Sequence, residues 1–146
     1  MLNYTNVITE KKSYTGLQMK EIKPVMKLII RGKKRDFLSA IGKSLNLLLP
    51  TEANTSSRSD KLTALWLSPD EWMIYSNETS SLENNDYEIE NLLSKNISKT
   101  NLGAVTDVTD QFVLINIKGD KIFDLFETGS PFNFNDFRNK IGSVTQ

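Results

Sequence analysis

Two apolar runs separated by four turn-forming residues constrain the fold of this chain more than any other feature. The runs are Ala64–Leu67 and Trp72–Tyr75, and the segment between them reads Ser-Pro-Asp-Glu. Proline fixes its own φ in a turn, and serine and aspartate side chains hydrogen-bond to nearby backbone groups. We therefore predict a β-hairpin with strands at residues 61–67 and 72–76.

The same four turn residues also match the beginning of a helix. Ser68 and Glu71 have the spacing of a capping box, and Pro69 would take the first helical position. We favour the hairpin because the run that begins at Trp72 lacks helical periodicity.

The remaining pattern alternates strands and helices. Residues 25–30 form an apolar run typical of a buried strand, and apolar residues from Phe37 to Leu48 recur at helical spacing until Pro50. Further along we expect polar loops at 51–60 and 77–86, a helix over 87–100, strands at 104–108 and 112–117, and a helix from 120 to 129. This order predicts an α+β fold, with antiparallel sheets and helices on one face.

A weak internal similarity suggests that the chain contains two related halves. The segment Leu28–Gly32 and the helix after it resemble Leu114–Gly119 and its helix, and a proline follows each helix. We therefore expect one main domain over residues 25–146, with half-domains at about 25–102 and 103–146.

The two chain ends are less regular. Residues 1–24 carry scattered apolar side chains without a sustained period, so we expect an extended N-terminal arm. Packing along a neighbour and an unpacked terminus both stay open for this arm. Residues 132–146 stop where another strand would begin. This predicts a C-terminally truncated sheet, with a frayed natural terminus as the alternative.

The chain has no histidine and no cysteine, which excludes several classes of reactive site. It cannot form the usual zinc sites, an iron–sulfur cluster, a cysteine or Ser-His nucleophilic pair, or a histidyl or cysteinyl bond to flavin. It also cannot form disulfides, which fits a reducing compartment, and no N-terminal segment has the order of a signal peptide. We therefore expect a cytoplasmic protein.

Charge and hydropathy argue against nucleic-acid and membrane partners. Eighteen basic and eighteen acidic side chains cancel, so no net field draws the chain to polyanions. No apolar run approaches the length that spans a membrane. The basic cluster Lys33-Lys34-Arg35 is able to grip a phosphate, but we interpret it as the solvated first turn of a helix.

A partial phosphate-loop motif fails on both residue and context. The segment Ile41–Ser44 would need a further glycine at the position of Phe37, and it lies inside the predicted helix. We interpret Gly42 as a position of close packing or of helix weakening.

Two carboxylate pairs are candidates for acid–base chemistry. They are Asp70 with Glu71, and Asp107 with Asp110. Both pairs lie at predicted turns, where acidic residues are common for local hydrogen bonding, so we interpret them as turn residues.

The aromatic residues offer two further candidates. Trp66 and Trp72 are able to stack a pterin or flavin ring, although paired tryptophans on a hairpin more often supply core or interface packing. Phe132, Phe134 and Phe137 lie near an expected sheet edge, and we predict contact between them and another chain.

Several of these blocks together resemble the gamma subunit of heterotetrameric sarcosine oxidase. The block Ala64–Trp72 is the most specific, and the resemblance extends from about Val25 to the end of the chain. The other blocks, in chain order, are Arg31-Gly32, Leu49–Asn54, Ala104–Thr109 and Gly129–Pro131.

Residues 103–131 also resemble the folate-binding fold of the glycine-cleavage aminomethyltransferase. In this segment Thr109 replaces a serine and Asp110 replaces a residue that is commonly histidine. These departures weaken any expectation of direct folate chemistry. The two resemblances imply that both half-domains are folate-binding-like, with a ferredoxin-like arrangement.

The resemblance implies a non-catalytic structural subunit. In that family the complex oxidatively demethylates sarcosine to glycine and passes the one-carbon unit to tetrahydrofolate. FAD, FMN, NAD, tetrahydrofolate and zinc would be held by the alpha, beta and delta subunits, so no catalytic, cofactor-binding or metal residue is expected in this chain. Two alternatives stay open: a stand-alone folate-binding protein of methyl transfer or repair, and a ligand-free adaptor for an unrelated enzyme.

Overall fold

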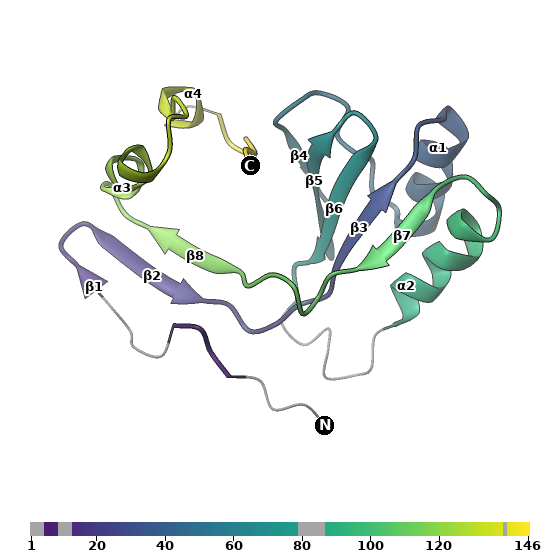
Figure 1. Ribbon diagram of the computed structural model, residues 1–146, viewed down its shortest axis with the longest axis horizontal. Coiled ribbons are helices and arrows are strands. Elements are labelled where there is room, and N and C mark those ends of the chain that lie inside the picture. The colour runs from purple at the N-terminus through teal and green to yellow at the C-terminus, as the bar shows by residue number, and fades with distance from the viewer. Residues whose placement is uncertain (1–4, 9–12, 79–86, 139) are drawn as a thin grey trace. The chain divides into compact units, whose positions relative to one another are not determined.

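The computed structural model describes residues 5–8, 13–78, 87–138 and 140–146 (Figure 1). The chain forms two compact units. Unit 1 comprises Met1–Lys23 and Val113–Ile141, and unit 2 comprises Pro24–Phe112 and Gly142–Gln146. Antiparallel strand pairs and helices build both units, which confirms the predicted α+β class.

Unit 2 is a five-stranded antiparallel sheet in the order β4-β5-β6-β3-β7, with helices on one face (Figure 1). The strands are β3 (Lys27–Arg31), β4 (Ser56–Arg58), β5 (Leu62–Ser68), β6 (Glu71–Ser76) and β7 (Ala104–Asp107). The helices are α1 (Arg35–Leu45), α2 (Glu88–Leu93) and the π-helical turn η1 (Ser94–Ser98). The strand β4 falls inside the predicted loop at 51–60, and most of the predicted loop at 77–86 lies outside the described residues.

The predicted hairpin is confirmed as β5 and β6. Ser68 pairs with Glu71, so Pro69 and Asp70 form the connection between the strands. The Ser68 hydroxyl donates a hydrogen bond to Asp70 Oδ1 over 2.9 Å, as the turn chemistry of the sequence predicts. The alternative of a helix beginning here is wrong, because residues 71–76 pair along their length with β3 and β5.

The core of unit 2 lies between its sheet and its helices. Phe37 and Trp72 are at most 3% exposed, and their ring centroids lie 5.8 Å apart. The Trp72 indole donates to the Pro50 carbonyl over 2.7 Å, which satisfies its one buried donor. The other buried apolar residues of this cluster are Met26, Leu28, Ile30, Ile41, Leu47, Leu49, Leu62, Ala64, Ile74, Leu93 and Ile97.

The helix α1 is shorter than predicted. It ends at Leu45 because Asn46 adopts a left-handed conformation, with φ 50° and ψ 40°. Pro50 therefore does not end the helix. The early end also changes which leucine is buried, since Leu47 is 4% exposed and Leu48 is 80% exposed.

Unit 1 contains a three-stranded antiparallel sheet in the order β1-β2-β8. Its elements are β1 (Ser13–Tyr14), β2 (Leu17–Glu21), β8 (Ile115–Lys118), α3 (Ile122–Gly129) and α4 (Asn135–Arg138). Met19 pairs with Ile117, and Gln18 pairs with Lys118, so apolar and polar residues alternate across both strands. The predicted arm thus contains a strand that pairs within its own chain.

A cluster of aromatic rings joins the two helices of unit 1. Neighbouring ring centroids in the cluster lie 5.2–6.5 Å apart. Phe134 lies at its centre and is 6% exposed, and the guanidinium of Arg138 lies 5.3 Å from the Phe123 centroid. The members of this phenylalanine cluster are Phe123, Phe126, Phe132, Phe134 and Phe137.

The division into units differs from the expected boundary between residues 102 and 103. β7 lies after that boundary but pairs with β3 of unit 2, whereas β8 pairs with β2 of unit 1. The C-terminal segment also differs from the prediction that a strand begins there. It contains α4 and then a single antiparallel bridge between Ser143 and Thr55.

Candidate functional site

The carboxylates of the hairpin turn are engaged in local contacts. Asp70 lies 3.5 Å from the Lys33 ammonium, and Glu71 lies 3.4 Å from the Arg31 guanidinium. The hydrogen bond from Ser68 lowers the pKa of Asp70, and the nearby positive charges lower it further. A depressed pKa keeps Asp70 ionised at neutral pH, so this carboxyl is poorly suited to act as a general acid.

The second acidic pair also forms a turn. Asp107 accepts a hydrogen bond from the Thr109 amide over 2.7 Å, and the Gln111 amide donates to the Val108 carbonyl over 3.0 Å. Asp107 and Asp110 are both exposed. The interpretation of both pairs as turn residues therefore agrees with their hydrogen bonds.

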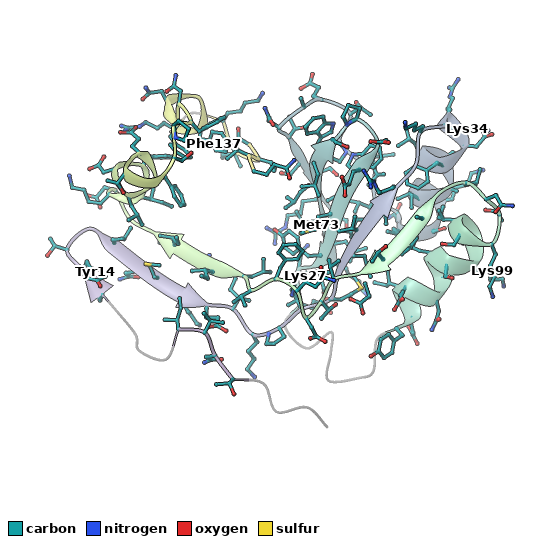
Figure 2. The ribbon with its side chains drawn as sticks, viewed as in Figure 1. Tyr14, Lys27, Lys34, Met73, Lys99 and Phe137 are labelled. Carbon is teal, nitrogen blue, oxygen red and sulfur yellow. The ribbon has the colours of Figure 1, made fainter. Side chains whose placement is uncertain are left out.

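A buried lysine beneath this turn is the site residue that sequence reasoning missed. Lys27 is 1% exposed, and its ammonium donates to the Val25 carbonyl over 2.9 Å (Figure 2). Burial lowers the pKa of Lys27, while the charges of Asp110 and Asp107 oppose that lowering. The apolar run at 25–30 correctly predicted a buried strand, but gave no sign that its lysine would be buried as well.

The two tryptophans are packing residues. Trp72 lies in the core of unit 2 and its indole nitrogen is already bonded, so it has no face free for a flat ligand. Trp66 pairs with Trp72 across the hairpin and packs, partly buried, against the same core. Only Trp66 retains the exposure that a stacking role would need.

The basic cluster lies at the beginning of α1, although only Arg35 belongs to the helix, and the partial phosphate-loop motif lies inside the helix as predicted. Lys34 precedes the first turn of α1 and is exposed, like Lys33 and Arg35 (Figure 2). Gly42 lies inside α1, and a Cβ at that position would meet Leu48 Cδ2 at 3.7 Å, an ordinary contact. Close packing therefore does not require this glycine, which leaves helix weakening as its effect.

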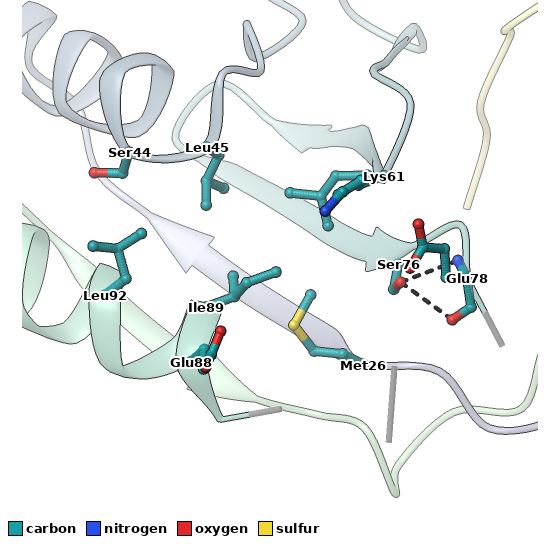
Figure 3. Close-up of a pocket in the computed structure, with 10 residues that line it drawn as sticks. Met26, Ser44, Leu45, Lys61, Ser76, Glu78, Glu88, Ile89 and Leu92 are labelled. Atoms are coloured by element: carbon teal, nitrogen blue, oxygen red, sulfur yellow. Dashed lines mark hydrogen bonds between the residues drawn. The ribbon is translucent and has the colours of Figure 1, made fainter. Parts of the chain in front are cut away.

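A pocket of about 380 Å³ opens at one end of the unit 2 sheet (Figure 3). It lies between the end of α1, the beginning of α2 and the strand ends at Met26, Lys61 and Ser76. Its lining combines apolar side chains with one lysine and two glutamates. No motif in the sequence pointed to it, because its residues come from five separate segments of the chain.

Apolar exposure is concentrated in unit 1. Of its described residues only Phe134 is a buried hydrophobic. Val113, Ile115, Leu125 and Phe126 are each 37–43% exposed. Phe132, Phe134 and Phe137, which the sequence analysis expected to contact another chain, pack against one another in the phenylalanine cluster; Phe134 is at its centre and Phe137 belongs to α4 (Figure 2).

Within the ranges that the structure describes, no three Asp or Glu side chains are grouped closely enough to hold a metal ion. Among the same residues, no helix is both long and apolar enough to cross a membrane.

Comparison with known proteins gives a fold-level match. No protein-family model matches the chain, and no curated protein matches it. Among solved structures, it is similar to a chain of the heterotetrameric sarcosine oxidase from Corynebacterium sp. U-96 in complex with pyrrole 2-carboxylate. The TM-score is 0.73 at 15% identity, and the match covers 90% of this chain and 65% of that one. The two chains therefore share a fold, and this chain spans about two thirds of its neighbour's length.

Proposed function

We propose that this chain is a non-catalytic structural subunit of a heterotetrameric sarcosine oxidase. In this proposal the assembly demethylates sarcosine oxidatively to glycine and transfers the one-carbon unit to tetrahydrofolate. The alpha, beta and delta subunits are its partners and hold FAD, FMN, NAD, tetrahydrofolate and zinc. The chain would act in the cytoplasm, since a protein without cysteine needs no oxidising compartment.

The main support for a subunit role is the exposed apolar surface of unit 1. Val113, Ile115, Leu125 and Phe126 all lie within a short stretch of the chain, and all are more than a third exposed. A soluble monomer rarely exposes many large apolar side chains together, and aromatic residues and arginine are enriched where proteins meet. Burial of this surface against another chain would supply the core that unit 1 lacks.

The fold match supports a role as a subunit. The neighbour is a chain of a heterotetramer, and its fold covers 90% of this chain. The sequence blocks that resemble the gamma subunit add independent support. The contacts of the acidic pairs agree with a structural role, because Asp70, Glu71 and Asp107 stabilise turns and strand ends.

Co-expression with candidate alpha, beta and delta subunits tests this function. We expect the chain to co-purify in a stoichiometric complex, and Ile115→Lys to weaken its retention at least tenfold, because a buried interface position would receive a charge. The matched control is Asn116→Lys, on the opposite, polar face of the same strand. The function would be refuted if the chain were a stable monomer and the other subunits assembled with full activity without it.

A further inference from the structure

We propose that the pocket of unit 2 binds a small organic ammonium ion with an apolar body (Figure 3). This inference goes beyond the proposed function and does not depend on partner subunits. The ten lining residues that the structure describes all belong to unit 2.

The walls of the pocket are apolar side chains anchored in the core. Met26 and Leu62 are 3% and 4% exposed, and Leu45 and Ile89 pack against the same core from α1 and α2. Ligand sites typically combine apolar walls of this kind with a few polar groups that orient the ligand. A volume of about 380 Å³ lies within the size range of small-molecule sites.

The charged groups of the pocket favour a cation. Its lining contains the ammonium of Lys61 and the carboxylates of Glu78 and Glu88. Figure 3 shows Lys61 and Glu78 on one side of the pocket, with Glu88 on α2 opposite them. None of the three forms a salt bridge with another described residue, and two carboxylates against one ammonium leave the lining negative.

The two serines of the pocket differ in whether their hydroxyl groups remain available to a ligand. Ser76 is occupied, because its hydroxyl donates to the Glu78 carbonyl and accepts from the Glu78 amide. Ser44 accepts a hydrogen bond from the Asn96 side chain over 2.9 Å, which leaves its own O–H as a donor. An ammonium ion would therefore be oriented by the carboxylates, with its apolar body against the leucine and isoleucine walls.

Amide chemical shifts of the isolated chain test the proposal. The probe is 2-phenylethylammonium, compared with neutral 2-phenylethanol and with anionic phenylacetate. We expect saturable shifts for the ammonium ion at Leu45, Leu62 and Ile89. The alcohol should bind several-fold more weakly, because it has the same ring without the charge, and the anion should bind weakest.

A matched pair of glutamate variants locates the charge. We expect Glu88→Gln to weaken binding of the ammonium ion about two- to fivefold, as for an ion pair at an exposed carboxylate. Glu90→Gln is the control, because Glu90 also lies in the first turn of α2 and does not line the pocket. Unchanged dispersion of the amide spectrum would show that both variants are folded.

Three results would overturn the proposal. They are shifts that do not saturate with the ammonium ion, equal affinity for the alcohol, and equal losses in the two glutamate variants. The subunit function would survive any of them, because its own test measures assembly with other chains.

Discussion

The two units contain the same local pattern, a strand followed by a glycine and a helix, but the helix buries apolar side chains in one unit and leaves them exposed in the other. In unit 2, β3 lies between two neighbouring strands and Phe37 of the following helix is fully buried. In unit 1, β8 is an edge strand, and Leu125 and Phe126 of the following helix are exposed. The contrast shows that the sequence pattern is enough to form the strand and the helix. A buried core forms only where further elements pack against their apolar faces.

The largest expected effect is a difference in stability loss between one substitution in unit 2 and one in unit 1. Phe37→Ala should lower the free energy of unfolding by about 3–5 kcal/mol, because it leaves a large cavity in the core. Phe126→Ala in the isolated chain should cost clearly less, about 1–2 kcal/mol, because that residue is 37% exposed and its ring stacks against only one described ring, that of Phe134. Urea unfolding measures both, and similar losses would contradict the assignment of the core to unit 2.

A pair of glycines sharpens the account of packing around Phe37. A Cβ at Gly103 would overlap the Arg31 carbonyl oxygen and lie 2.8 Å from Phe37 Cε2. Gly103→Ala should therefore lower the free energy of unfolding by about 1–3 kcal/mol or more. A melting temperature equal to that of the unmodified chain would show that the backbone relaxes without cost.

The control glycine should respond in the opposite direction. Gly42 lies in α1, where an added Cβ would make only ordinary van der Waals contacts, and alanine is the better helix former. Gly42→Ala should raise the free energy of unfolding by about 0.5–1 kcal/mol. Destabilisation instead would mean that this glycine is needed for packing after all.

The pH dependence of unit 2 should report the buried Lys27. Because burial lowers its pKa in the folded state, the unfolded chain binds this proton more tightly. The charged lysine therefore destabilises the fold below its folded pKa, and the penalty fades as pH rises through that pKa towards the unfolded value of about 10.4.

A variant without Lys27 isolates this smaller effect. We expect the stability of the original chain to rise, relative to Lys27→Met, as the pH increases from neutral to alkaline values. Thermal unfolding of both proteins across that range gives the difference, in which the titration of other groups cancels. A difference that does not change with pH would show that Lys27 has no lowered pKa.

The sequence predicted the elements that local patterns encode. The hairpin was predictable because its apolar runs and its Ser-Pro-Asp-Glu turn act over a few residues. β4 was missed because Ser56–Arg58 is polar, and only its pairing with β5 makes it a strand. β2 was not predicted because only Leu17 and Met19 alternate with polar residues there, and β8, one of its two partners, lies almost a hundred residues further along the chain.

For the candidate sites, too, local features were predictable from the sequence and features that depend on distant segments were not. The turn roles of Asp70 and Asp107 were predictable, because each hydrogen-bonds within two residues. The burial of Lys27 and the charged lining of the pocket were not, since both depend on segments that meet only in the fold. The boundary of the units was missed for the same reason, because strand pairing sets it.

Hydrogen exchange of backbone amides tests most directly whether unit 1 depends on a partner. In the isolated chain we expect Leu28 and Ile74 of unit 2 to exchange only through global unfolding, and Met19 and Ile117 of unit 1 to exchange much faster. Addition of the partner subunits should slow exchange in unit 1 and leave unit 2 almost unchanged. Equal protection of both units in the isolated chain, with no change on assembly, would contradict the account.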